Sequence, residues 1–131
     1  MPACLDKTTA SHRPVIFLPA FLVLQAIAGA AIGNGNHSSD EAPASKQALQ
    51  DAINLIAELP FRLLGDPDVA PFYGEIHMSW TNGPKQIVVM CFPNRASLIH
   101  QYRRVPGHPS EHSIEQAAPD RLIYWLEWLR A

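Results

Sequence analysis

Apolar and polar residues between positions 45 and 60 repeat with the period of a helix. Ser45 is a favourable N-cap, and Pro60 ends the segment because proline lacks the backbone N–H that a helix interior needs. The apolar residues fall on one stripe, opposite polar residues such as Asp51: Ala48, Leu49, Ala52, Ile53, Ile56 and Leu59. This pattern predicts an amphipathic helix that buries one side.

From residue 74 the period becomes that of a strand. In "GEIHMSW", residues 74–80, an apolar row alternates with a polar row: Ile76, Met78 and Trp80 against Glu75, His77 and Ser79. Further strands are predicted at residues 85–92 and 97–103, with a short fourth one near residues 113–115. The turns "TNGP" and "PNRA" separate the first three strands, and a four-residue first turn places Trp80 opposite Lys85.

A last helix is predicted from Pro119 and Asp120, which suit a helix N-terminus. Its residues divide into two faces: Leu122, Trp125, Leu126 and Leu129 on one, and Tyr124, Glu127 and Trp128 on the other. The predicted fold is therefore α+β, an antiparallel three- to four-stranded meander with an N-terminal and a C-terminal helix packed on one face.

The first third of the chain has a different composition. Residues 14–36 contain no acidic or basic side chain, Lys7 and Arg13 precede them, and Asp40 and Glu41 follow. We divide the chain into an apolar leader (1–33), a linker (34–44) and a small domain (45–131). The leader is a signal peptide, a membrane anchor spanning residues 14–33, or a mis-called start. The first two interpretations predict an exported or membrane-anchored protein, and the third a cytoplasmic one.

Charge and cysteine content exclude some classes of function. The 131 residues carry a formal net charge of −2, so binding of nucleic acid through phosphate neutralisation is disfavoured, although the local pair Arg103 and Arg104 leaves it open. Cys4 and Cys91 are far apart and form no CxxC pair. They indicate neither a disulfide framework nor a zinc knuckle.

Two groups of residues are candidates for chemistry. Glu75, His77 and Ser79 share one side of a strand, and His108 and His112 lie four residues apart in "VPGHPSEH". Together His77, His108 and His112 suggest a metal-binding protein or a small metal-dependent hydrolase. The prolines and the glycine around His108 and His112 favour a solvated loop. The alternation of Glu75, His77 and Ser79 with apolar residues favours the solvent-facing side of a strand. We recognise no catalytic constellation and expect no cofactor.

The order of a Pro-Ala-Ser helix start, "LP" at the helix end, "GEIHMSW", an Asn-Gly turn and a Leu-rich terminal helix resembles a loose bacterial group. Its members are small uncharacterised proteins with a GEI-x-L-x-W strand, often encoded in mobile or variable genome regions. The likeness covers residues 42–130. It implies an accessory protein of a mobile element, for example an inhibitor of a host system, and it implies no reaction and no catalytic residues.

A candidate interaction surface follows from the expected register. If the second turn has four residues, Phe92 lies opposite Ser97 and Val89 opposite His100. Leu98, His100 and Tyr102 then face the core, and the other side of the sheet carries Glu75, His77, Ser79, Val88, Met90, Phe92, Ile99 and Gln101. Strand two is apolar on both sides, which is typical of an interface or of a covered face.

We therefore predict a non-enzymatic protein-binding domain or a homo-oligomer. The candidate partner-binding residues lie on the outer side of the sheet and on the last helix: Val88, Met90, Ile99, His77, Tyr124 and Trp128.

Overall fold

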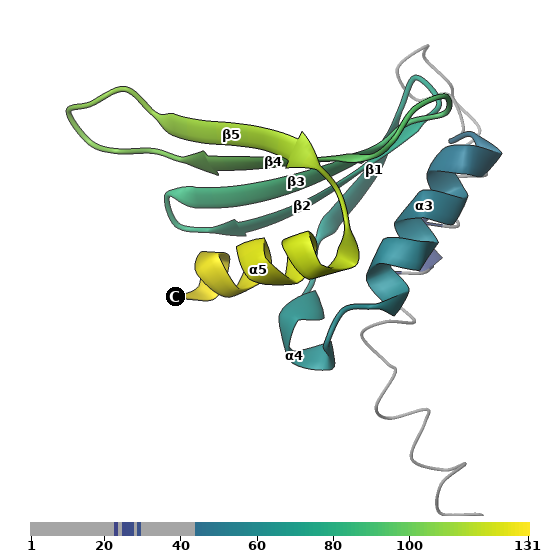
Figure 1. The fold of residues 1–131 in the computed structure, drawn as a ribbon, viewed down its shortest axis with the longest axis horizontal. Coiled ribbons are helices and arrows are strands. Elements are labelled where there is room, and N and C mark those ends of the chain that lie inside the picture. The colour runs from purple at the N-terminus through teal and green to yellow at the C-terminus, as the bar shows by residue number, and fades with distance from the viewer. Residues whose placement is uncertain (1–22, 24, 28, 30–43) are drawn as a thin grey trace, which may run out of the picture.

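The computed structural model describes residues 23, 25–27, 29 and 44–131. Helix α3 (Lys46–Ala57) and the short helix α4 (Phe61–Leu64) are followed by five strands and a last helix, α5 (Pro119–Arg130). The strands are β1 (Asp68–Phe72), β2 (Glu75–Asn82), β3 (Lys85–Cys91), β4 (Leu98–Arg103) and β5 (Glu111–Gln116). They form one antiparallel meander in the order β1-β2-β3-β4-β5 (Figure 1). The α+β class and the antiparallel order are confirmed.

Helix α3 begins where its sequence predicts. The Ser45 side chain accepts a hydrogen bond from the Ala48 N–H over 3.1 Å, which satisfies one of the free donors of the first turn. The buried residues of α3 are Ala48, Ala52, Leu55 and Ile56. Pro60 ends α3 and caps α4, and the chain leaves α4 through Gly65 at a φ of +57°, a conformation that favours glycine.

The predicted number of strands is wrong, because β1 lies in a segment that its prolines mark as a turn. Proline is tolerated on the edge of a sheet, and β1 is an edge strand with Pro71 inside it. Tyr73 and Gly74 connect β1 to β2 with φ angles of +52° and +83°. Two consecutive positive φ angles fit the twist of a two-residue hairpin.

The predicted register of the first long hairpin is also corrected. The turn between β2 and β3 consists of Gly83 and Pro84, so Asn82 lies opposite Lys85 and Trp80 opposite Ile87. This displaces the pairing by two residues. Because side chains alternate with a period of two, every residue of β2 and β3 keeps the face that its sequence predicts.

Strand β4 differs from its prediction by one residue, and that difference reverses its faces. Val89 lies opposite Ile99, not His100, and Met90 lies opposite Leu98. Ile99 and Gln101 therefore point into the core, where they are 1% and 8% exposed. Leu98, His100 and Tyr102 point the other way.

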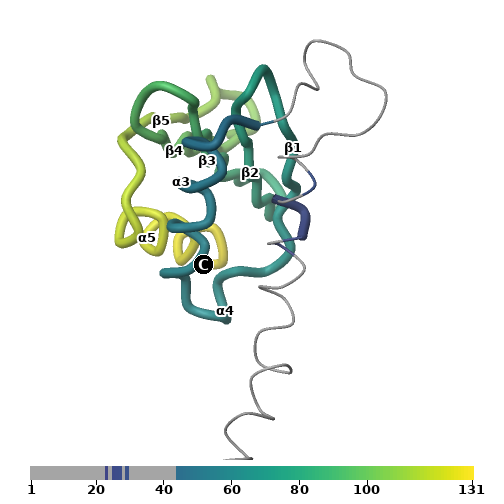
Figure 2. The backbone as a smooth tube through the Cα atoms, turned by 90° about the vertical axis from the view of Figure 1, so that its right-hand side faces the viewer, coloured from purple at the N-terminus to yellow at the C-terminus, as the bar shows by residue number. Residues whose placement is uncertain are grey.

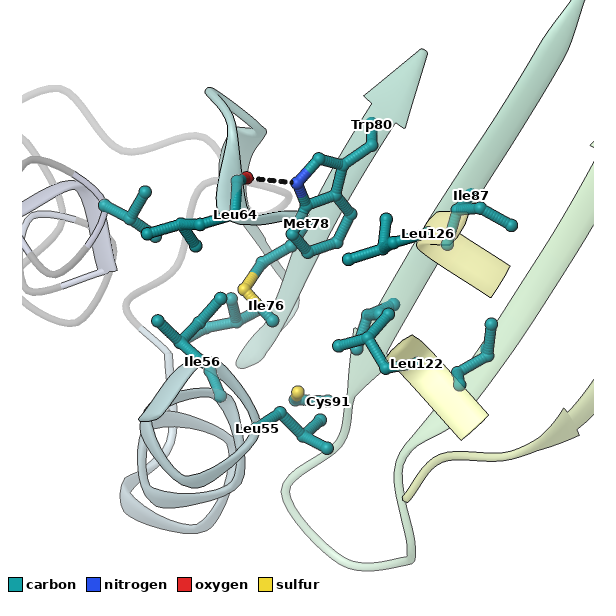
Figure 3. Close-up of a cluster of buried hydrophobic side chains, with 14 of the residues drawn as sticks. Leu55, Ile56, Leu64, Ile76, Met78, Trp80, Ile87, Cys91, Leu122 and Leu126 are labelled. Carbon is teal, nitrogen blue, oxygen red and sulfur yellow. Dashed lines mark hydrogen bonds between the residues drawn. The ribbon is translucent and has the colours of Figure 1, made fainter. Parts of the chain in front are cut away.

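The core lies between the sheet and the helices (Figure 3). The predicted core row of β2 is confirmed, since Ile76, Met78 and Trp80 are buried. Ile87, Val89 and Cys91 extend the same face on β3. From α5 the three leucines Leu122, Leu126 and Leu129 are buried, and Trp125 packs partly against them, as predicted. Because α4 contributes Leu63 and Leu64, the predicted arrangement of only two helices is incomplete.

Part of the apolar leader belongs to this core as well. The described residues between 23 and 29 are helical and are drawn in purple in Figure 2. Val23 and Ile27 are 4% and 0% exposed and belong to the same buried cluster as the strands and α3. In the part of the chain that the structure describes, no helix has the length and apolar character to cross a bilayer. The remainder of 1–33 and the linker up to residue 43 lie outside the described residues, so export or anchoring stays a prediction.

Candidate protein-binding surface

The face of the sheet turned away from α3 and α5 is called the outer face here. Its strand residues follow from the register: Asp68, Ala70, Phe72, Glu75, His77, Ser79, Thr81, Gln86, Val88, Met90, Leu98, His100, Tyr102, His112, Ile114 and Gln116. No helix of the described part of the chain lies over these residues (Figure 1). Within the described residues, this five-stranded face is therefore not covered by a helix.

The centre of the outer face is apolar. Met90 lies between His77 on β2 and Leu98 on β4, and Val88 lies between Ser79 and His100 in the next row. Val88, Met90 and Leu98 are half-buried. A solvated sheet face usually alternates to polar residues, so three adjacent apolar side chains on its central strands are typical of an interaction site.

Exposed aromatic rings stand at the β1–β2 end of this face. Phe72 and Tyr73 are 42% and 55% exposed, and their rings meet edge to face with centroids 4.5 Å apart. The Phe72 ring also lies 5.4 Å from the ring of His77, whose Nε2 is 2.8 Å from Glu75 Oε1. Tyr73 holds its exposed ring in a backbone conformation that costs a non-glycine residue about 1–2 kcal/mol. Such strain is often retained at functional positions.

The β5 end of the face carries a second group. Ile114, in the middle of β5, is 57% exposed and lies opposite His100. The rings of His100 and His112 meet edge to face, 5.7 Å apart. Among the described residues, none forms a hydrogen bond to the buried Nε2 of His100. Apolar and aromatic groups therefore extend from β1 to β5.

The charges of the outer face have one sign. Its strand residues include the carboxylates of Asp68 and Glu75 but no lysine or arginine. Arg103 pairs instead with Glu111 over 3.0 Å, on the other side of the sheet. A surface that binds the phosphates of a nucleic acid needs basic groups. The strand residues of this face therefore lack the positive charge that nucleic-acid binding requires.

The structure brings together only some of the residues predicted from the sequence. His77, Val88 and Met90 are neighbours on the outer face, as expected. The predicted placement of Ile99 on the outer face is wrong, because the corrected register of β4 turns it into the core, where it is 1% exposed. Tyr124 and Trp128 lie on α5, on the opposite side of the sheet. Tyr124 is 53% exposed beneath the Arg121 guanidinium, whereas Trp128 packs partly against the core, with the Lys85 ammonium 4.9 Å from its ring centre.

The histidines proposed as metal ligands are distributed over the sheet. His77 is on β2 and His112 on β5, so two strands separate them, and His108 is in the loop before β5. Three strand spacings of about 4.8 Å place His77 and His112 about 14 Å apart across the sheet, and their rows also lie four residues apart along the strands, a further offset of about 13 Å. The described residues hold no group of three or more His, Cys, Asp or Glu side chains placed to bind a metal ion.

The free thiol of Cys91 lies in the core beside α3. Burial raises the pKa of Cys91 to about 11, although a hydrogen bond with Ser97 acts in the opposite direction. The Ser97 hydroxyl also donates to Asp51 Oδ2 over 3.2 Å, which ties the start of β4 to α3. A thiol that stays protonated at neutral pH is not a nucleophile, so this cluster is structural.

The hollows next to the core include two whose walls carry polar groups. One, of about 440 Å³, lies between the end of β2, Gly65 and the end of α5, but Asn82 and Arg130 in its wall already donate to the carbonyls of Leu129 and Leu63. The smaller, about 310 Å³, lies between Asp51 and Ser97, which bond to each other. The polar groups of both walls stabilise the joints between elements.

The residues of this surface that sequence reasoning missed include Phe72, Tyr73, Leu98 and Ile114, together with His100 and Tyr102, which were expected to face the core. Phe72 and Tyr73 were missed because the prolines around β1 indicated a turn and not a strand. A signal for the strand was present: before Gly74, Val69 and Pro71 alternate with Ala70 and Phe72, which is the period of a strand. Leu98 was missed through the register of β4. No protein-family model, curated protein or solved structure matches the chain.

Proposed function

We propose that the protein is a non-enzymatic protein-binding domain and that the outer face of its sheet is the binding surface. The observation that supports this most directly is the apolar centre of Val88, Met90 and Leu98 on a face that no described helix covers. Burying apolar surface contributes about 25 cal/mol per Å². A partner that covers this apolar centre and excludes water from it therefore makes the free energy of binding more favourable.

The exposed aromatic residues strengthen the proposal. Phe72 and Tyr73 stand at one end of the face with large, rigid, amphipathic or apolar rings, the kind of side chain that is enriched at binding hot spots. A partner with a complementary apolar ridge would cover Met90 and Leu98 and contact both rings. A nucleic-acid partner is disfavoured, because the strand residues of this face include no basic side chain.

The resemblance to bacterial proteins of mobile or variable genome regions extends the proposal by one step. On that basis the domain is an accessory protein of a mobile element, and an inhibitor of a host system is one form of such a role. The outer face would then bind the host protein. This step rests on the motifs of residues 42–130 alone.

The test is capture of a binding partner by the full chain in its own cells, followed by measurement of the affinity of that partner. Val88→Lys and Met90→Lys place a charge in the apolar centre and should each weaken binding at least about tenfold. Glu58→Lys, on the exposed end of α3, is the matched control and should leave binding unchanged. Equal affinity of all three variants would contradict the use of this face.

A further inference from the structure

Strand β5 is an open edge of the sheet. It pairs with β4 on one side and with no described strand on the other. Five of its six residues are exposed, with Glu115 the exception. An edge strand presents a row of backbone N–H and C=O groups that match another extended chain.

The backbone groups that face outward belong to the even-numbered residues. The Ala117 N–H donates to the Ser97 carbonyl over 2.8 Å, and the register of β4 and β5 places these two residues opposite each other. Hydrogen-bonded pairs alternate with non-bonded pairs along an antiparallel ladder. Odd-numbered residues of β5 therefore bond to β4, and His112, Ile114 and Gln116 direct their N–H and C=O groups away from the sheet.

The two edges of the sheet are protected differently. At the other edge, the tight turn makes Phe72 and Glu75 a bonded pair, so the outward groups of β1 belong to Val69 and Pro71. Pro71 has no N–H to donate. Strand β5 has no proline, no lysine and no positive φ angle that would mark a bulge. Proline, lysine and bulges are among the devices that prevent pairing of an edge, and of these three β1 has one, Pro71, whereas the charged residues of β5, Glu111 and Glu115, lie on the inner side of the sheet.

We propose that two copies of the protein pair through β5, antiparallel and about a two-fold axis that passes by Ile114. This register places Ile114 opposite Ile114, His112 opposite Gln116, and Ser113 opposite Glu115. All three outward-facing residues of each copy then form bonded pairs. A register centred on Ser113 would instead place Glu111 opposite Glu115, and like charges directly opposite each other are destabilising.

Symmetry limits the product to a dimer. The interface uses the same edge of both copies, so it closes on itself. A head-to-tail filament would need β5 to pair with β1, whose outward row is interrupted by Pro71. Because the two-fold axis is perpendicular to the sheet, the outer faces of the two copies form one continuous face. The exposed Ile114 side chains of the two copies meet on that face. The pairing does not depend on the proposed binding of another protein.

The register can be tested by disulfide formation in the full chain with Cys4 replaced by Ser. Opposite residues of a bonded pair have Cα atoms about 5.5 Å apart, within the range of about 4.4–6.8 Å that a disulfide spans. Ile114→Cys should therefore give a disulfide-linked dimer under mild oxidation. Gln116→Cys is the matched control, since the two Gln116 positions lie about four residues apart along the strands, roughly 14 Å. Equal cross-linking of both variants would overturn the register.

Analytical ultracentrifugation of the unmodified chain tests the dimer itself. Ile114→Pro removes the outward N–H without removing a bond to β4, and it should shift the protein to the monomer, whereas Ile114→Ala keeps the N–H and should remain largely dimeric. Circular dichroism of both variants checks that the fold is retained. A chain that stays monomeric at about 100 μM, well above the dissociation constants of specific interfaces, overturns the proposal. Val88→Lys should leave the dimer intact, which separates this result from the test of partner binding.

Discussion

The indole N–H of Trp80 on β2 donates a 2.7 Å hydrogen bond to the carbonyl of Leu64 at the end of α4 (Figure 3). Trp80 is 4% exposed, so this bond satisfies a carbonyl that water barely reaches. It connects the core row of β2 to a helix of only four residues. A short helix gains little stability from its own hydrogen bonds and depends on such contacts.

Trp80→Phe should therefore lower the free energy of unfolding by about 1–3 kcal/mol, because it leaves the Leu64 carbonyl without its donor in an apolar site. Urea denaturation followed by circular dichroism measures the change. Tyr124→Phe on the exposed side of α5 is the control and should change stability by less than about 0.5 kcal/mol. Equal values for the two variants would show that the bond contributes nothing.

The joint between β5 and α5 should weaken in acid. The Glu115 carboxylate accepts two bonds from Arg121, of 2.6 and 3.1 Å, and one from Trp125, of 3.1 Å. The hydrogen bond from Arg121 is the largest cause that lowers the pKa of Glu115. Since the folded pKa is below the unfolded one, the stabilisation is present above the unfolded pKa of about 4.3 and is lost as pH falls through the folded pKa.

Thermal melts from pH 7 down to pH 3 should therefore show a smaller acid-induced decrease for Glu115→Gln than for the unmodified protein. Glu111→Gln on the same strand is the matched control. The Glu111 side chain, which pairs with Arg103, is 56% exposed against 29% for Glu115, and exposed ion pairs contribute little. If both variants followed the unmodified protein, the Glu115 contacts would not account for the acid sensitivity.

The described residues between 23 and 29 should contribute to folding. Ile27 is fully buried in the core, whereas Gln25 is exposed. Ile27→Ala should lower the free energy of unfolding by about 2–5 kcal/mol, since it removes buried methyl groups and leaves a cavity. Gln25→Ala should have almost no effect. A chain that begins at residue 44 should be destabilised at least as much as Ile27→Ala. Equal stability of the shortened and full chains would exclude a structural role for Val23 and Ile27.

Tyr73 should show opposite effects on stability and on binding. Its φ of +52° suits asparagine or glycine better than tyrosine. Tyr73→Asn should therefore raise the free energy of unfolding by about 0.5–1 kcal/mol. If Tyr73 contacts the partner, the same change should weaken binding. Tyr73→Phe is the control for stability, because it keeps the β-carbon and the ring. A decrease in stability for Tyr73→Asn would mean that the ring packs more strongly than its 55% exposure indicates.

The thiol of Cys91 should react only when the protein opens. Its pKa of about 11 leaves almost no thiolate at pH 8, and the side chain is fully buried. Labelling with a thiol reagent at pH 8 should therefore follow global unfolding and increase with urea at the same midpoint as circular dichroism. The Cys4→Ser background makes Cys91 the single reporter. Rapid labelling in the native state would contradict the described burial.

The outer face shows how far the sequence can predict a surface. Alternation in "GEIHMSW" correctly separated Ile76, Met78 and Trp80 from Glu75, His77 and Ser79, because neighbouring side chains of a strand point to opposite faces wherever the strand is placed. The register of β4 depended on the length of one turn. An error of one residue there exchanged Ile99 for Leu98, since all side chains of a strand change face together.

The sequence by itself determined the local features: the cap at Ser45, the amphipathic character of α3 (though not the burial of Leu55), the alternation of β2 and the leucines of α5. These depend on interactions among residues a few positions apart, which the order of residues specifies directly. Only the tertiary structure decided that β1 exists behind Pro71, that Val23 and Ile27 share the core, and that β5 ends the sheet as an open edge. Each of these features depends on which segment, distant in the sequence, packs against the residues concerned. Burial against that segment outweighs the local secondary-structure preference of those residues.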